Sequence, residues 1–126
     1  MITEDYVSFE TAKLLKEKGF DCVVTRSFFE NDNFYAPCDP SEVPRKDGIA
    51  IPTLQMATKW LREVHNLFIF ISTWLRNKDG TVQYYYEIRN LNDKDFETIA
   101  ESTITEFDSP EKTCEAAIKY CLENLI

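Results

Sequence analysis

Residues 67–89 read Leu-Phe-Ile-Phe-Ile-Ser-Thr-Trp-Leu-Arg-Asn-Lys-Asp-Gly-Thr-Val-Gln-Tyr-Tyr-Tyr-Glu-Ile-Arg and carry the clearest structural signal in the chain. Apolar side chains occupy both alternating positions between Leu67 and Leu75, as in a central strand that is covered on both sides. The stretch from Asn77 to Gly80 has the composition of a hairpin turn. Apolar and polar residues then alternate from Val82 to Arg89, which predicts an antiparallel strand with one buried face.

Three further segments combine helical periodicity with start or stop signals. The first follows Ser8, a good N-cap residue, and stops before Gly19, which suits a left-handed C-terminal position. The second follows Thr53 and stops at Asn66. The third starts at Asp108, whose side chain can cap a helix. We therefore expect three helices.

The remaining segments complete the predicted fold. Cys22–Phe29 is rich in β-branched and aromatic residues and Thr98–Phe107 is a weaker strand candidate. Residues 30–48 contain three prolines and many Asn and Asp residues, which predicts a long irregular loop. The 126 residues fit a single domain, 1–126. The predicted class is α+β, with a mostly antiparallel sheet of about four strands, about three helices packed mainly on one face, and the order α-β-α-β-β-β-α.

The charge balance limits the partners that we expect. The formal net charge is −8, so the surface repels nucleic-acid backbones and anionic membranes. We expect no direct binding of nucleic acid or membrane. The chain shows no apolar signal-peptide segment, and its longest apolar run, Leu67–Ile71, is too short to span a bilayer. The expected location is the cytoplasm, with reduced thiols.

The cysteines and the single histidine give little basis for chemistry. None of the four cysteines forms a Cys-x-x-Cys pair, so we expect no metal site and no cofactor. Cys38 lies beside Asp39, whose carboxylate would raise the pKa of that thiol and make it a poor nucleophile. Cys114 and Cys121 fall on the apolar stripe of the last helix and are expected to be small buried residues. The pattern predicts no catalytic residues and a protein that is not an enzyme.

The helices carry a family resemblance. They read Tyr6-Val-Ser-Phe-Glu-Thr-Ala-Lys-Leu-Leu-Lys-Glu-Lys-Gly-Phe20, Pro52-Thr-Leu-Gln-Met-Ala-Thr-Lys-Trp-Leu-Arg-Glu-Val64 and Cys114-Glu-Ala-Ala-Ile-Lys-Tyr-Cys-Leu-Glu-Asn-Leu125. These segments resemble a group of small uncharacterised proteins encoded in gut Bacteroidales genomes, frequently in phage-like or mobile elements. The resemblance covers little of the strands. It implies a phage or mobile-element origin and transfers no catalytic residue.

Three aromatic residues are candidates for contact with a partner. Phe34 and Tyr35 are large rings within the predicted loop, and a fully solvated loop has little reason to carry them. Packing of both rings on the domain itself is the alternative. Tyr85 occupies a polar position of the alternating strand, and aromatic residues are enriched at protein interfaces.

Two functions are compatible with these features. The leading hypothesis is a small non-enzymatic accessory module that binds another protein, and a homodimer is one form that this binding could take. The alternative is an acidic regulator or decoy that mimics DNA and binds a basic protein. The alternative depends on the acidic residues of the C-terminal half, which are Asp93, Asp95, Glu97, Glu101, Glu106 and Asp108.

Overall fold

A computed structural model of the chain describes residues 2–22, 24, 26–29, 34–37, 48–102 and 107–126. The helices are α1 (Phe9–Glu17), α2 (Leu54–His65) and α3 (Pro110–Tyr120), and α3 continues into a π-helical turn over Cys121–Leu125. The strands are β1 (Arg26–Phe29), β2 (Phe34–Pro37), β3 (Gly48–Ala50), β4 (Leu67–Arg76), β5 (Val82–Asn90) and β6 (Thr98–Glu101).

The fold is α+β and its described strands pair antiparallel, as the sequence predicts. They form two sheets instead of one, with the orders β2-β1-β3 and β4-β5-β6. Two of the strands were not predicted: β2 lies inside the segment 30–48 that was predicted to be an irregular loop, and β3 begins at the last residue of that segment, Gly48. Residues 30–33 and 38–47 of the segment lie outside the described residues. Phe34 and Tyr35 have high β propensity, which the prolines around them obscured.

The predicted helix ends are largely confirmed. Ser8 Oγ accepts the Thr11 amide at 3.2 Å, and Thr53 Oγ1 accepts the Met56 amide at 3.1 Å. Asn66 ends α2 in the left-handed region with φ 57°. These caps satisfy amides and carbonyls that a helix cannot pair internally.

The start of α3 differs from the prediction by one residue. Ser109 Oγ, and not the side chain of Asp108, accepts the Lys112 amide, at 3.1 Å. Asp108 forms an ion pair with Lys112 Nζ at 3.0 Å, which lowers the pKa of the Asp108 carboxyl. Both side chains of the Asp-Ser pair therefore serve the same helix end.

The β4–β5 hairpin forms as predicted, but among the described strands β4 lies at the edge of its sheet and not at the centre. Pairing runs from Leu67 opposite Asn90 to Arg76 opposite Val82, with an irregularity between Thr73 and Leu75. The central strand of this sheet is β5. The prediction was wrong because apolar residues at both odd and even positions show only that both faces of the strand are apolar. They do not show whether other elements cover those faces.

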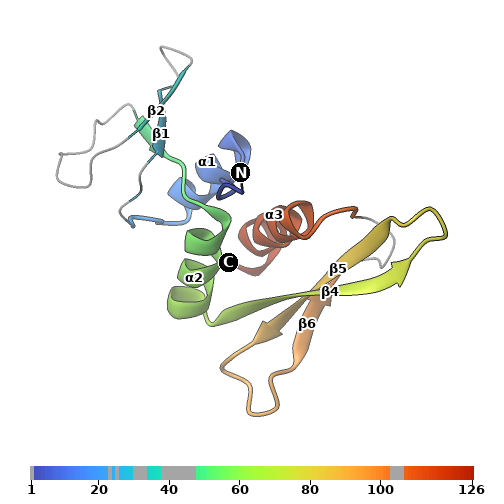
Figure 1. The fold of residues 1–126 in the computed structure, drawn as a ribbon. Coiled ribbons are helices and arrows are strands. Elements are labelled where there is room, and N and C mark those ends of the chain that lie inside the picture. The colour runs from blue at the N-terminus through green and yellow to red at the C-terminus, as the bar shows by residue number, and fades with distance from the viewer. Residues whose placement is uncertain (1, 23, 25, 30–33, 38–47, 103–106) are drawn as a thin grey trace.

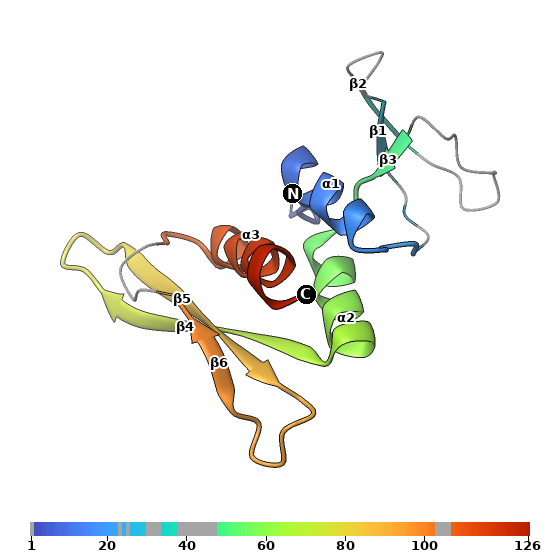
Figure 2. The same cartoon turned by 180° about the vertical axis from the view of Figure 1, so that it is seen from behind.

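The third helix occupies the middle of the molecule. Figures 1 and 2 show α3 between the β4-β5-β6 sheet and α1, with α2 alongside it. Helices α2 and α3 pack against the hairpin, whereas the small β2-β1-β3 sheet lies beside α1, away from the larger sheet. The fully buried apolar side chains include Leu15, Ile51, Leu61, Ile88, Ile118 and Leu122.

A single carboxylate joins the first helix to the last. Glu115 Oε1 on α3 accepts the Ser8 amide at 3.0 Å and the Thr11 hydroxyl at 2.6 Å. Thr11 is fully buried, and its hydroxyl donates to this carboxylate and accepts from Ser8 Oγ at 3.1 Å. The start of α1 is thus held by a residue from the other end of the chain.

Replacing Glu115 by Ala should lower the free energy of unfolding by about 1–3 kcal/mol, because two donors lose a charged acceptor and one of them is buried. Urea unfolding followed by tryptophan fluorescence, to which the buried Trp60 and the exposed Trp74 both contribute, measures the change. The control is Glu17→Ala, an exposed glutamate of α1, which should change stability by less than about 0.5 kcal/mol. Equal effects of the two substitutions would contradict the assigned role.

Candidate functional site

The side of the β4-β5-β6 sheet that faces away from α3 carries several uncovered apolar side chains. Residues opposite one another in an antiparallel pair point to the same side, so the register defines this set. Tyr86 and Ile88 are buried on the helix side, which places their odd-numbered neighbours on the other. We call this set the outer sheet face, and it comprises Phe68, Phe70, Ser72, Leu75, Gln83, Tyr85, Glu87 and Arg89.

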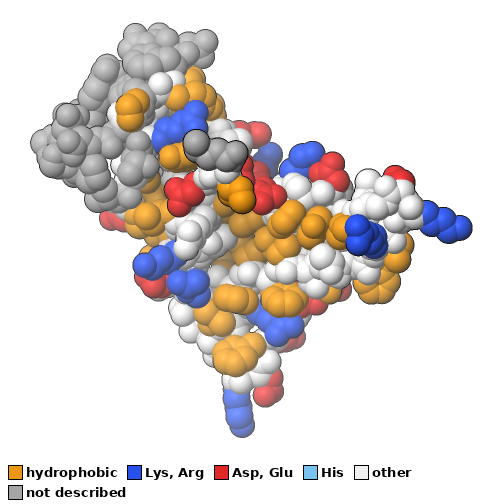
Figure 3. Space-filling model, viewed as in Figure 1, with side chains coloured by type: hydrophobic (Ala, Val, Ile, Leu, Met, Phe, Trp, Pro, Cys, Tyr) orange, Lys and Arg blue, Asp and Glu red, His pale blue; other side chains and the backbone are white. Residues whose placement is uncertain are grey.

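The large apolar side chains of β4 on and beside the outer sheet face are highly exposed for a strand of this composition. The exposed fractions are 37% for Phe68, 41% for Phe70 and 51% for Leu75, and Trp74 at the irregularity reaches 57%. Figure 3 shows hydrophobic side chains across the region of this sheet, interleaved with charged ones. Contiguous exposed apolar side chains mark contact sites more often than single ones do.

The charges on the outer sheet face compensate one another. Arg89 Nη2 lies 3.0 Å from Glu87 Oε2, and the Arg89 guanidinium lies 5.5 Å from the centre of the Phe70 ring. A cation over an aromatic ring is attracted by the negative face of the ring. The centre of this face is therefore apolar and locally neutral, although the whole chain carries −8.

The three residues singled out from the sequence do not lie together. Tyr85 is half-buried on the outer sheet face, opposite Ser72. Tyr35 belongs to the other sheet, where its ring lies 4.7 Å from that of Phe28. The backbone of Phe34 pairs with Phe29 in β2, and its side chain lies outside the described part of the structure.

Tyr35 packs within the small sheet. The Arg26 guanidinium lies 4.3 Å from the centre of the Tyr35 ring and 4.8 Å from that of Tyr6. The two rings therefore lie within stacking distance of one cation and link β2 to the segment before α1. Tyr35 therefore packs on the chain itself but keeps 45% of its surface exposed, and its contact with a partner stays a prediction.

The sequence did not single out Phe68, Phe70 or Leu75 as exposed residues. A usable signal was nevertheless present, because the polar positions Glu87 and Arg89 of the partner strand must share a face with them in a hairpin. Apolar residues of one strand that lie opposite polar residues of its partner indicate an exposed face. On such a face the apolar strand exposes side chains that are usually buried.

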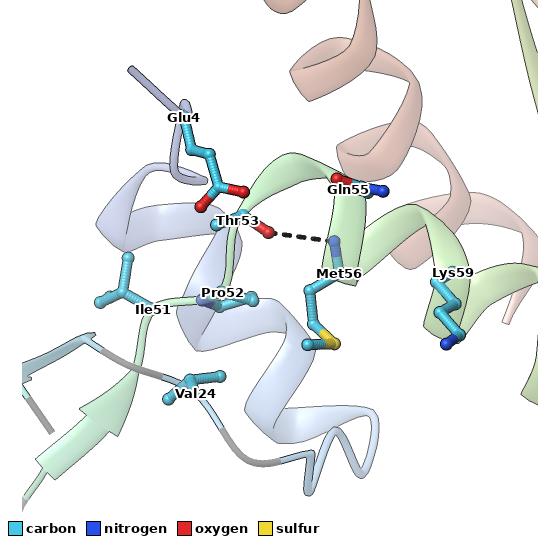
Figure 4. A pocket seen from close by; sticks show the side chains of 8 residues that line it. All are labelled: Glu4, Val24, Ile51, Pro52, Thr53, Gln55, Met56 and Lys59. Atoms are coloured by element: carbon cyan, nitrogen blue, oxygen red, sulfur yellow. Dashed lines mark hydrogen bonds between the residues drawn. The ribbon is translucent and has the colours of Figure 1, made fainter. Parts of the chain in front are cut away.

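A cavity of about 310 Å³ lies at the start of α2 (Figure 4). The residues that line it are Glu4, Val24, Ile51, Pro52, Thr53, Gln55, Met56 and Lys59. The Met56 amide, which could bind an anion at a helix start, already donates to Thr53 Oγ1. The cavity has mixed chemistry and no convergent polar groups among its described side chains that define a ligand.

The helix thiols are protected rather than reactive. Cys121 is buried, as predicted, whereas Cys114 is half-buried. Burial raises the pKa of each thiol to about 12, and for Cys114 the neighbouring carboxylates of Glu115 and Glu111 add to the effect. Among the described residues, no three His, Cys, Asp or Glu side chains gather as metal ligands would. Cys38 lies outside the described residues.

The acidic residues of the C-terminal half are spread over several elements. Asp93 and Asp95 lie in the turn after β5, where Asp93 Oδ1 accepts the Asp95 amide at 2.8 Å. Glu97 and Glu101 flank or belong to β6, and Asp108 is paired with Lys112. Glu106 lies outside the described residues. The described members form no continuous row of phosphate-like charges along one element.

Comparison of the chain with known protein families, curated proteins and solved structures found no match. Among the described helices, none combines the length and the apolar character needed to cross a membrane.

Alkylation at pH 9 should label Cys114 and Cys121 slowly in the native protein, since only about one thiol in a thousand is ionised three pH units below its pKa. In denaturant, both should react at the rate of free cysteine. Mass spectrometry of the labelled peptides gives the rates. Native labelling of Cys121 as fast as in denaturant would show that the thiol is accessible and ionised.

Replacing Tyr35 by Ser should lower the free energy of unfolding by about 1 kcal/mol, because the contacts with Phe28 and Arg26 are lost. The matched control, Tyr35→Phe, keeps the ring and should preserve most of the stability. Thermal unfolding measures both variants. If Tyr35→Ser melts at the same temperature as the parent protein, the ring does not anchor β2.

Proposed function

We propose that the protein is a small non-enzymatic interaction module that binds another protein through the outer sheet face. The observation that supports this most directly is the exposure of Phe68 and Phe70 on a strand whose other side is packed against α3. Ordered aromatic rings on a rigid sheet lose little conformational entropy on binding, and aromatic residues are enriched at interface centres.

The composition of this face defines the chemistry of the partner. Its centre is apolar and carries a neutral Glu87–Arg89 pair, while Ser72 and Gln83 offer polar groups beside it. A matching surface has an apolar centre without net charge and hydrogen-bonding groups at its rim. A strongly basic partner, which the decoy hypothesis requires, would find no excess of negative charge here.

The remaining features support a binding role over a chemical one. The burial that raises the pKa of Cys114 and Cys121 leaves them poor nucleophiles near neutral pH. An accessory role in a phage-like or mobile element is part of the proposal, and its support is the resemblance of the three helices.

The test uses the tagged full chain expressed in its native host, with Phe68→Ser and Phe70→Ser combined in one variant. A protein that co-purifies with the parent chain should be lost with this variant, because the apolar centre is removed. The control, Val64→Ser, alters an apolar residue of α2 that is more exposed than either ring, and it should retain the partner. Quantitative mass spectrometry compares the three samples.

The same purification at low and moderate salt separates the two hypotheses. Binding through an apolar centre should persist at moderate salt, and the complex should re-form from the purified components. Binding by an acidic decoy should collapse as salt screens the charges. A partner that is retained by the double variant and lost with salt would overturn the proposal.

A further inference from the structure

The two edges of the β4-β5-β6 sheet differ in how they are protected. Strand β6 is short, spanning Thr98–Glu101, and carries a charge. Strand β4 spans Leu67–Arg76, and its sequence from Leu67 to Leu75 has no charged residue, proline or glycine. Protein sequences normally block a long edge strand with such residues, because its free amides and carbonyls pair readily with another strand.

The apolar side chains of β4 are incompletely covered on both of its faces. Phe68 and Phe70 are exposed on the outer sheet face. Ile69 and Ile71 point toward the helices but remain only partly buried. Within the described residues, β4 pairs with β5 alone. Strand β4 therefore has the apolar composition of a central strand but lies at the edge of its sheet.

We infer that a second copy of the chain pairs with the free edge of β4. Antiparallel pairing of β4 with its counterpart would create a continuous sheet of the order β6-β5-β4-β4-β5-β6. In that sheet β4 is central, as its sequence indicates, and the side chains of both faces gain neighbours. This arrangement removes the conflict between the composition of β4 and its position.

The symmetry of a dimer fixes a register. The regular part of β4 runs from Leu67 to Thr73, before the irregularity, and Phe70 is its midpoint. A two-fold axis at Phe70 places the two Phe70 rings opposite one another and each Phe68 opposite a Ser72. On the helix side it places Ile69 opposite Ile71. Each of these pairs joins uncharged side chains, so no like charges meet along the regular strand.

Charge also favours a second copy over an unrelated partner at this edge. The stretch of β4 from Leu67 to Leu75 offers no charged group for a charged segment to recognise, so the matching strand is itself uncharged and apolar. Strand β4 of a second copy meets that requirement, and its concentration equals that of the protein. The pairing is isologous, since the same residues contribute from both copies.

This inference concerns the edge of the sheet and goes beyond the proposed function, which concerns its outer face. Pairing at the edge would bring the two outer sheet faces side by side. A further partner could then bind a wider surface that includes both Phe70 rings. The dimer can therefore exist whether or not such a partner is found.

The test measures mass by light scattering and sedimentation for the parent chain, F70K and F70E. Each substitution places like charges against each other at the axis and should raise the dimer dissociation constant by about tenfold or more. An equimolar mixture of F70K and F70E should regain the dimeric mass, since opposite charges then meet. Val64→Lys, at an exposed position of α2, should remain dimeric. Circular dichroism and thermal unfolding establish that each variant is folded.

Three results would overturn the inference: a parent chain that stays monomeric up to about 100 µM, a dimer that F70K and F70E leave intact, or monomeric variants whose mixture does not associate. None of these results bears on the co-purification experiment. A partner lost with the Phe68→Ser and Phe70→Ser variant would still support the proposed function if the chain is monomeric. A dimer without any such partner would support the edge pairing and not the proposed function.

Discussion

The arrangement of the helices depends on the two hydrogen bonds that the Glu115 carboxylate accepts from Ser8 and Thr11. In an ordinary capping box, a Glu or Gln three residues after the N-cap accepts the amide of the cap residue. Thr11 occupies that position in α1, where its hydroxyl accepts from Ser8 Oγ and donates to Glu115 Oε1. The acceptor for the Ser8 amide comes from α3. The first helix is therefore fully capped only when the last helix has docked.

This dependence explains the central place of α3. Its apolar stripe faces the β4–β5 hairpin, while Glu115 holds α1 and Lys119 reaches Glu10 at 3.2 Å. The exposed ion pair adds little to stability, since such pairs are worth about 0–1 kcal/mol. The partly buried hydrogen bonds to Glu115 carry more, because the Thr11 hydroxyl has been removed from water. Helix α3 thus joins the sheet to the N-terminal part of the chain.

The sequence predicted what is specified locally. The caps at Ser8 and Thr53, the left-handed Asn66 and the turn that ends at Gly80 each follow from the geometry of a few neighbouring residues. The division of the strands into two sheets and the link from Glu115 to α1 join residues that are distant in the chain. No local pattern encodes such a link, and one glutamate on a helix resembles any other.

The candidate site was only partly predictable for a related reason. Tyr85 was found because alternation along β5 separates a polar row from an apolar one. Phe68 and Phe70 were missed because apolar residues on both parities of β4 indicated two covered faces. The pattern of apolar residues indicates which faces of a strand need cover, and the described chain covers only the helix side of β4, where Ile69 and Ile71 are still partly exposed. The second cover must come from elsewhere if the composition of β4 is to be satisfied.

The outer edges of the sheet in the inferred dimer determine whether more copies can add to it. In the inferred dimer both outer edges are copies of β6, which is short and carries Glu101. Edges of this kind resist further pairing, and the net charge of −8 on each copy adds repulsion between dimers. An unprotected β4 at one edge and a protected β6 at the other therefore favour closure at two copies over growth into a fibre. The acidic surface and the apolar strand then act together, because the charge that keeps dimers apart is absent from the strand that joins two copies.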